Sequence, residues 1–314
     1  MSIYIPQDTT ALALGAEAVA RALQAAGVEP VRNGSRGLFW LEPLLEVDTE
    51  NGRIGFGPVT NKDIPGILDA LETDASSHHL YLGQVEKIEY LASQQRLTYA
   101  RAGLGDPVCL DNYQALNGFV GLSNALQMDG QQIVDQVKDS GLRGRGGAAF
   151  PAGIKWQTVL DCDSEQKYIV CNADEGDSGT FADRLVMEAD PYQLIEGMTV
   201  AGLAVGANQG YIYLRSEYPV AHKLLNIAIE RAVEANFLGD NIQGSGKTFH
   251  LEVRLGAGAY ICGEETSLLD SLEGKRGMVR AKPPLPAIEG LFGKPTVVNN
   301  VLTLAAISTI LEQG

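Results

Sequence analysis

A glycine-rich loop between cationic side chains is the first place where this sequence could bind an anion. Residues 140–156 read SGLRGRGGAAFPAGIKW, in a chain whose formal net charge is −15. Glycines allow backbone N–H groups to approach an anion and point at it. We therefore predict that the loop binds a phosphate or a dinucleotide rather than serving as a plain flexible loop. The glycines and cations concerned are Arg143, Gly144, Arg145, Gly146, Gly147 and Lys155.

The same loop also matches the string of a dinucleotide-binding Rossmann fingerprint, which we reject. Gly144, Gly146 and Ala149 have the GxGxxA spacing. That fingerprint requires a strand directly before it. Here Ile133, Val134 and Val137 form one apolar helical face that ends at Gly141, so a helix is expected instead.

A second group of polar residues follows an apolar segment typical of a buried strand, residues 168–171. The sequence CNADEGDSGTFAD, residues 171–183, places Asn172, Asp174, Glu175 and Asp177 at the carboxyl end of that strand. Ligands of open α/β sheets bind at such ends. Carboxylates can accept ribose hydroxyls, and an amide can read the edge of a flavin or a base. A divalent-cation site and a solvated loop remain alternatives.

Two later segments carry further candidate residues. LGAGAYICGEET, residues 255–266, turns from a strand into a helix that opens with Glu264 and Glu265, where acids are also ordinary helix caps. KPPLP, residues 282–286, comes before Asn299 and Asn300, which we place at the start of the last helix, where they could cap it.

One sequence resembles a phosphate-binding loop without meeting its requirements. GSGKT, residues 244–248, ends like a P-loop, but Asn241 stands where the pattern needs glycine. A strand is expected after Thr248 in place of the helix that a P-loop requires. ATP binding by this segment is therefore disfavoured.

Composition excludes several classes of protein. The strongly acidic balance disfavours nucleic acid and anionic membranes as partners. None of the four cysteines forms a CxxC pair, so spacing predicts neither a zinc site nor a self-contained iron–sulfur site, and no metal ligand is assigned. We see no signal peptide and no apolar run approaching the roughly 20 residues of a membrane span. These features indicate a cytoplasmic protein.

The positioning elements suggest an α/β chain of two domains and a connection. Residues 1–110 suit a thioredoxin-like βαβ–ββα domain: strands at 2–5, 28–31 and 44–47, a helix at 11–26, a hairpin turn at Asn51-Gly52 and a short helix at 64–71. Residues 111–140 read as a helical connection, after a helical segment at 85–95. Residues 141–314 alternate strands and helices, as in a Rossmann-like domain. Its expected later elements are helices at 195–205, 265–272 and 297–311 and strands at 211–214 and 250–255.

Taken together, these motifs resemble the NADH-binding flavoprotein subunit of respiratory complex I and its relatives. The relatives are the diaphorase subunit of NAD-reducing hydrogenases and the beta subunit of soluble NAD-dependent formate dehydrogenases. The motifs of residues 141–314, ending in KPTVVNN, occur in the family's order. The segment VRNGSRGLFWLEP, residues 31–43, looks most like the formate dehydrogenase subunit.

The resemblance implies an FMN site overlaid by a site for NAD(H). By matching motif, the FMN residues would be Gly144, Arg145, Gly146, Gly147, Lys155, Asn172, Asp174, Glu175, Gly263, Glu264, Asn299, Asn300 and Thr303. The nicotinamide nucleotide would lie near Phe150, Asp177, Tyr260, Glu265 and Lys282. Glu175 and Glu265 are the acids expected to take part in catalysis. Thr158 and Leu285 stand where family members often have aromatic residues, so adenine stacking is expected to be weaker or differently made.

The implied reaction is hydride exchange between NAD(H) and FMN, which the cofactors perform and the protein orients. In the formate dehydrogenase setting, the partners would be an iron–sulfur thioredoxin-like subunit and a molybdenum-containing subunit. The family continues with a ubiquitin-like domain and a helical domain holding a [4Fe–4S] cluster, and no CxxCxxC occurs here. We therefore expect a C-terminally truncated form, without a [2Fe–2S] cluster in residues 1–110. The alternatives are the equivalent subunit of complex I or of a hydrogenase, and a non-catalytic docking module.

Overall fold

The computed structural model describes residues 1–313 and divides the chain after Pro107 into two compact units. The last residue of the expected domain 141–314 lies outside the described residues. Residues 111–140, expected as a connection, fold into helices of the second unit. The apolar faces of α6 (Val120–Ala125) and α7 (Gly130–Asp139) pack against α10 (Pro191–Val205) and α13 (Val301–Gln313).

The first unit, residues 1–107, is built on a four-stranded sheet of order β1-β2-β3-β4, in which neighbouring strands are antiparallel. Val31 adds a parallel bridge to Tyr4 on the other side of β1. This succession has the βαβ–ββα order expected from the sequence, and the thioredoxin-like assignment stays a prediction. Its elements are β1 (Ile3–Tyr4), α1 (Thr9–Ala13), α2 (Ala16–Ala25), η1 (Phe39–Leu41), β2 (Leu45–Thr49), β3 (Gly52–Phe56), α3 (Ile64–Glu72), η2 (Ala75–Ser77), β4 (Tyr81–Gln84), η3 (Val85–Lys87) and α4 (Glu89–Ala92).

Two predicted elements of this unit are shorter than expected. The strand predicted at 28–31 is reduced to the bridge at Val31, since Pro30 has no N–H to donate to a ladder. The helix predicted at 85–95 is split into η3 and α4, because the backbone of Ile88 between them is extended. Elsewhere the apolar face of α2 and the strands β1–β3 share one core, which includes Val19, Leu23 and Phe56.

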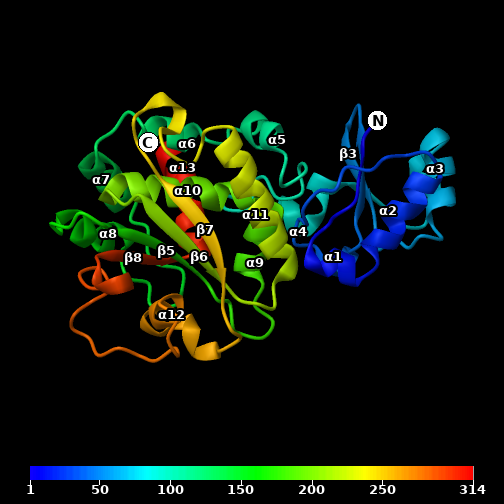
Figure 1. The fold of residues 1–314 in the computed structure, drawn as a ribbon. Helices are drawn as coiled ribbons and strands as arrows, with labels where there is room; N and C mark the ends of the chain where they lie inside the picture. The colour runs from blue at the N-terminus through cyan, green and yellow to red at the C-terminus, as the bar shows by residue number, and fades with distance from the viewer. Residues whose placement is uncertain (314) are drawn as a thin grey trace. The chain divides into compact units, whose positions relative to one another are not determined.

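The second unit carries a fully parallel sheet of order β7-β6-β5-β8. Figure 1 shows α10 and α13 on one face of the sheet and α12 on the other. Its elements are α5 (Leu110–Ala115), α6 (Val120–Ala125), α7 (Gly130–Asp139), α8 (Ala152–Asp161), β5 (Tyr168–Ala173), α9 (Ala182–Ala189), α10 (Pro191–Val205), β6 (Gln209–Leu214), α11 (Pro219–Glu234), η4 (Ile242–Gly244), β7 (His250–Leu255), η5 (Tyr260–Gly263), α12 (Glu265–Leu272), η6 (Leu291–Gly293), β8 (Thr296–Asn300) and α13 (Val301–Gln313).

The last helix begins later than predicted, and this changes the place of two candidate residues. Residues 296–300 form β8, which pairs with β5, and α13 starts only at Val301. Thr296, Val297 and Val298 are β-branched and buried, which favours a strand in a sheet covered on both faces. Asn299 and Asn300 therefore end a strand beside Cys171 and Asn172 instead of opening a helix.

The central helix α10 packs closely against α13 on the same face of the sheet. Proline at its first position and glycine at residue 206 in the left-handed conformation fix its two ends. A Cβ at Gly197 would stand only 2.0 Å from the carbonyl oxygen of Leu304, so glycine is required where α10 crosses α13. This tight support holds β5 and β8, whose carboxyl ends carry the polar motifs.

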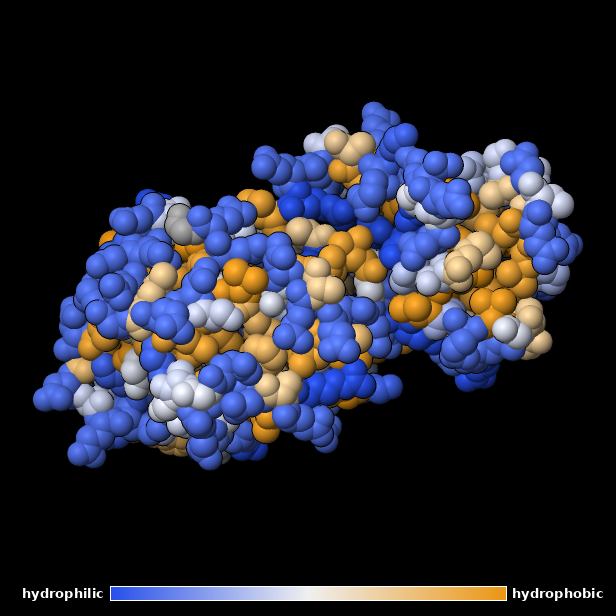
Figure 2. Space-filling model, turned by 90° about the horizontal axis from the view of Figure 1, so that it is seen from above, coloured by the Kyte–Doolittle hydropathy of each residue, from blue (hydrophilic) through white to orange (hydrophobic). Residues whose placement is uncertain are grey.

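On the face drawn in Figure 2, hydrophilic residues cover most of the surface and hydrophobic residues show among them. None of the helices within residues 1–313 is both long and apolar enough to cross a membrane.

Candidate functional site

A cavity of about 500 Å³ opens at the carboxyl ends of β5 and β8. Four sequence motifs that lie far apart in the chain meet in its walls. The predicted residues that line it are Gly144, Gly146, Phe150, Lys155, Asn172, Gly263, Glu264, Glu265, Lys282, Asn299 and Asn300. The position agrees with the rule that open parallel sheets bind ligands at the carboxyl ends of their strands.

The glycine loop forms one wall of this cavity, between α7 and α8. The helix α7 precedes it, as predicted, so the Rossmann fingerprint is excluded here. The N–H of Gly144 donates to Phe150 O at 2.8 Å, and the N–H of Arg145 donates to Thr303 Oγ1 at 2.9 Å. A Cβ on Gly146 would lie 3.3 Å from Asn300 Cβ, which is closer than ordinary contact. A small residue therefore suits the point where the loop meets β8.

Several donors of this loop remain available for a ligand. Among the described residues, the N–H groups of Gly146 and Gly147 donate no hydrogen bond, and Gly147 has φ +108°. The backbone N–H of Arg145 and the fully buried Thr303 side chain fasten the loop to α13. Free N–H groups beside a glycine turn favour an anionic ligand.

Two lysines and two glutamates form a charged network along the opposite wall. Lys282 Nζ lies 3.1 Å from Glu264 Oε1 and 2.8 Å from Glu265 Oε1, and Lys155 Nζ lies 3.4 Å from Glu265 Oε2. Lys155 also donates to Val298 O at 2.9 Å. Glu265 thus bridges both cations, and a ligand phosphate would compete with it for them.

Glu264 is additionally the N-cap of α12. Its Oε2 accepts from the N–H groups of Thr266 and Ser267 at 2.8 and 3.0 Å. Burial alone would raise the pKa of Glu264, but these hydrogen bonds and the charge of Lys282 outweigh it and lower the pKa. Capping and ligand binding, the two roles left open by the sequence, are compatible here, because Glu264 also lines the cavity.

Three asparagine amides are fixed at the ends of the strands. Asn172 donates to Gly263 O at 2.8 Å and accepts from the N–H of Asp174 at 3.1 Å. Asn299 accepts from Trp156 Nε1 at 2.9 Å. Asn300 donates to Asp183 Oδ2 at 2.7 Å. Because an amide offers two donors and two lone pairs, each side chain keeps hydrogen-bonding capacity for a ligand.

The two acids that follow β5 differ in their surroundings. Glu175 points away from the cavity: its carboxylate accepts from the N–H groups of Asp183 and Arg184 at 3.0 and 3.1 Å and from Tyr218 Oη at 3.0 Å. It therefore caps α9.

Asp174 is half-buried, and burial raises its pKa to about 6. The charge of Glu217 adds to this rise, whereas the charge of Arg215 opposes it. The Oδ2 atom of Asp174 is buried and has no hydrogen-bond partner among residues 1–313.

The remaining predicted residues lie at the surface and do not line the cavity. Tyr260 is 71% exposed and donates to Asp177 Oδ1 at 2.8 Å. A Cβ on Gly176 would stand 2.7 Å from the Tyr260 ring, so the ring lies directly on that backbone. The loop that carries Asp174, Glu175 and Asp177 holds no metal arrangement, since no group of three potential ligands occurs within residues 1–313.

Sequence reasoning missed part of the cavity wall. Thr296, Val298 and Ala287 line the cavity although none of them has a side chain that marks a site. Only the alternation of β8 could have revealed the first two, because Thr296, Val298 and Asn300 share one face of the sheet. The cavity is also lined by Ala148, Ala149, Thr158, Leu285 and Pro286.

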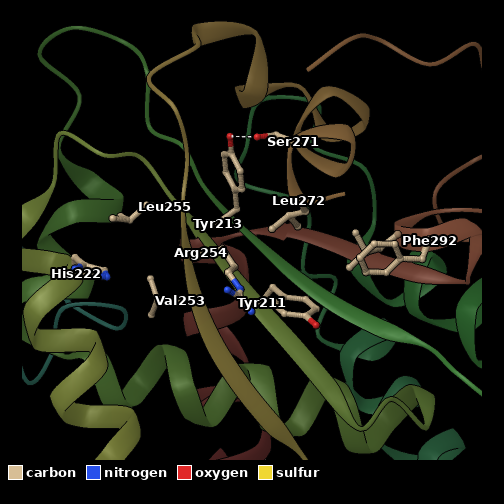
Figure 3. Close-up of a pocket in the computed structure, with 10 residues that line it drawn as sticks. Tyr211, Tyr213, His222, Val253, Arg254, Leu255, Ser271, Leu272 and Phe292 are labelled. Atoms are coloured by element: carbon tan, nitrogen blue, oxygen red, sulfur yellow. Dashed lines mark hydrogen bonds between the residues drawn. The ribbon is translucent and has the colours of Figure 1, made fainter. Parts of the chain in front are cut away.

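A second cavity, of about 610 Å³, lies over β6 and the edge strand β7. Figure 3 shows His222 and Leu255 at one side of it, Phe292 at the other, and the ring of Tyr213 pointing to Ser271. Three of its polar residues have partners: Tyr213 Oη donates to Ser271 Oγ at 2.9 Å, and Arg254 pairs with Glu252 outside the cavity lining. None of the predicted site residues lines it, so we assign the site to the smaller cavity.

The segment 244–248, which resembles the end of a P-loop, has a structural role in this fold. Lys247 Nζ donates to the carbonyl oxygens of Met128, Leu126 and Ala125, at 2.9, 3.3 and 3.5 Å, and so caps the end of α6. The strand β7 follows at His250, as predicted. This lysine has a structural role that occupies its donors.

Comparison with a family model gives a match over residues 137–309, to the Nuo51 FMN-binding domain. Among curated relatives, the HndC component of the NADP-reducing hydrogenase of Solidesulfovibrio fructosivorans is 52% identical over 221 residues, which are 70% of this chain and 45% of the relative. A component of the NADH-quinone oxidoreductase of Aquifex aeolicus is 51% identical over 205 residues, 65% of this chain and 48% of the relative.

A solved structure with the same fold is the NAD⁺-reducing [NiFe]-hydrogenase in its H2-reduced state. It is 29% identical with a TM-score of 0.58, over 100% of this chain and 52% of the other. The chain thus spans about half the length of the relatives that it matches.

Proposed function

Because the chain belongs to the family of the Nuo51 FMN-binding domain, we propose that its cavity binds FMN and NAD(H) and that the chain catalyses hydride transfer between them. The observation that supports this most strongly is the convergence of four motifs on one cavity at the carboxyl ends of β5 and β8. The named relatives are components of a NADH-quinone oxidoreductase and of a hydrogenase, which is consistent with this reaction.

The residues at the cavity fit the chemistry of FMN. A phosphate suits the open N–H groups of the glycine loop and the ammonium group of Lys155. Asp174 does not line the cavity, and its buried, unpartnered Oδ2, which needs a donor, is proposed to lie close behind the bound FMN. The edge of the flavin ring suits the amides of Asn172 and Asn300, since each keeps one N–H and one lone pair.

The nicotinamide nucleotide would occupy the outer part of the same cavity. Phe150 is exposed at the cavity and offers an aromatic face, and Glu265 and Lys282 offer one charge of each sign. Asp177, on the loop after β5, and Tyr260, in η5, lie at the surface and are proposed to contact the nucleotide only at its periphery. Leu285 offers an aliphatic rather than an aromatic surface to adenine.

When bound, FMN would supply the redox chemistry by accepting a hydride from NADH. The chain's own residues would bind the phosphates, orient the two rings and exclude water. Glu265 would change partners as a phosphate approaches Lys155, since it bridges both lysines in this structure. Glu265 is thus proposed to act in catalysis through orientation. Glu175 is proposed to act only by holding α9, which revises the role expected from the sequence.

The test is NADH oxidation with ferricyanide as the acceptor, before and after the purified chain is reconstituted with FMN. We expect activity only with FMN, and loss of that activity in Glu265→Ala. Folded protein that binds FMN but oxidises no NADH would overturn the catalytic proposal while leaving the binding proposal in place.

We further propose that the chain serves a cytoplasmic NAD-dependent formate dehydrogenase as its diaphorase subunit, with an iron–sulfur thioredoxin-like subunit and a molybdenum-containing subunit as partners. The segment 31–43 supports this choice over complex I or a hydrogenase. A [4Fe–4S] cluster is expected only in longer family members. Formate-dependent NAD⁺ reduction by the co-purified complex would support the assignment. Hydrogen-dependent reduction would contradict it and favour a hydrogenase subunit.

A further inference from the structure

A buried carboxylate lies directly behind the cavity wall and was not among the predicted site residues. Asp183, in the first turn of α9, is only 5% exposed. Its Oδ2 accepts a hydrogen bond of 2.7 Å from Asn300 Nδ2. Asn300 ends β8 and lines the cavity, whereas Asp183 does not, so the carboxylate reaches the cavity only through this amide.

The hydrogen bonds on Asn300 allow one orientation of its amide. The N–H of Leu302 donates to Asn300 Oδ1 at 2.9 Å, which places the amide oxygen toward α13. An ionised carboxylate can only accept, so Asp183 must face the NH2 group. Both neighbours therefore select the same orientation, and one N–H and one lone pair of Asn300 stay available to a ligand.

The backbone of Asp183 is held in place as well as its side chain. Its backbone N–H donates to Glu175 Oε1 at 3.0 Å, which ties the start of α9 to the loop after β5. Asn300 has little freedom to follow a displaced partner, because Gly146 approaches its Cβ closely from the glycine loop. If the Asp183 carboxylate were lost, the Asn300 amide would then rotate about its own terminal bond.

We infer that Asp183 is a positioning residue for the cofactor: it fixes the Asn300 amide so that its remaining N–H and lone pair face the bound FMN. This inference rests on the proposed function. The role is local and is strongest when Asp183 is ionised, since a hydrogen bond to a charged acceptor is stronger than one between neutral groups.

The burial of this acid is consistent with a specific role. Burial, together with the nearby carboxylate of Glu175, raises the pKa of Asp183 to about 7, against the hydrogen bonds from Asn300 and Leu302. Such a group is unfavourable for stability unless its hydrogen bonds offset the cost. Asn300 is the side chain that supplies that compensation.

The experiment is a double-mutant cycle read by the FMN dissociation constant, measured by titration of flavin fluorescence on the 314-residue chain. Asp183→Ala should weaken binding about tenfold, while Asp183→Asn, which keeps a neutral acceptor, should weaken it only about threefold. In an Asn300→Ala background, Asp183→Ala should cause no further loss.

Glu196→Gln is the matched control, because Glu196 is a buried carboxylate that accepts from the N–H groups of Phe119 and Leu122 and has no place in the cavity. It should lower thermal stability without changing FMN affinity. If Asp183→Ala does not fold, the cycle is run with Asp183→Asn.

Equal losses in the wild-type and Asn300→Ala backgrounds would overturn the inference, because Asp183 would then act without Asn300. An unchanged dissociation constant in folded Asp183→Ala would overturn it as well. Wild-type protein that binds no FMN would instead refute the proposed function, so the two failures are distinguishable.

Discussion

The two units of the chain both bury many polar groups, but they use them differently. In residues 1–107, Arg36 and Glu46 form an ion pair at 2.8 Å with both side chains 1% exposed, and Ser35 donates to Glu42 at 2.6 Å. In the second unit, Asn172 and Asn300 keep unused hydrogen-bonding capacity in the wall of a cavity. Asn33 Oδ1 and Arg96 Nη1 of the first unit are also buried without a hydrogen-bond partner among residues 1–313, but neither residue lines either of the two cavities described above. Bonded buried polar groups help to specify a fold, whereas hydrogen-bonding capacity left unused in a cavity wall indicates a ligand.

The largest effect on FMN binding is expected when a side chain fills the cavity. Gly146→Val places a branched side chain against Asn300 Cβ, where even a Cβ alone would stand at 3.3 Å. We expect FMN affinity to fall at least about 100-fold, with little change in thermal stability. Gly66→Ala in α3 is the matched control, since its nearest neighbour would be His78 Nε2 at 3.4 Å, and it should bind FMN normally. Normal FMN binding by Gly146→Val would contradict the site.

A buried acid in the first unit, Glu42, predicts a pH effect on stability. Burial and the charge of Asp8 raise the pKa of Glu42 to about 8, from 4.5. Between these values the unfolded chain releases a proton that the folded chain retains, so stability falls as pH rises through this window. Glu42→Gln should remove this dependence.

In that variant the amide can still accept from the N–H of Leu44 and donate to Ser35, so we expect the folded unit at pH 8 to be more stable by about 2 kcal/mol. Chemical denaturation at pH 5 and pH 8, analysed as a two-state transition, measures the difference. An unchanged pH slope would show that Glu42 is ionised in the fold.

A smaller loss of FMN affinity is expected when a single positive charge is removed from the cavity. Lys155→Met keeps most of the length of the side chain but removes the ammonium group that lies 3.4 Å from Glu265. We expect FMN to bind about tenfold more weakly, through loss of a charge-assisted contact to its phosphate. The exposed Lys223→Met on α11 provides the control, and an equal effect in both variants would point to net charge alone.

The smallest effect is expected at the lysine that imitates a P-loop. Lys247→Ala removes three bonds to carbonyl oxygens at the end of α6, which should cost about 1 kcal/mol of stability. FMN affinity should not change. Loss of ATP binding in this variant, measured by calorimetry, would restore the nucleoside-triphosphate role that the structure disfavours.

Much of this picture is available from the sequence, and the rest depends on contacts that no local pattern encodes. The glycine loop, the acid pair at 264–265 and the strand at 168–171 are predictable because each has a local signature. The assignment of Asn299 and Asn300 to a helix is wrong, since pairing of β8 with β5 overrides the helical appearance of an apolar run. The roles of Glu175 and Asp183 follow from the packing of α9, which the spacing does not reveal.

The central claim is that the cavity at the ends of β5 and β8 holds FMN. The direct measurement is the visible absorbance spectrum of the purified chain after incubation with FMN and removal of the excess, beside its thermal unfolding curve. We predict a flavin spectrum corresponding to one FMN per chain and an unfolding temperature raised by the cofactor. Protein that unfolds cooperatively, and is therefore folded, but retains no flavin would contradict the account.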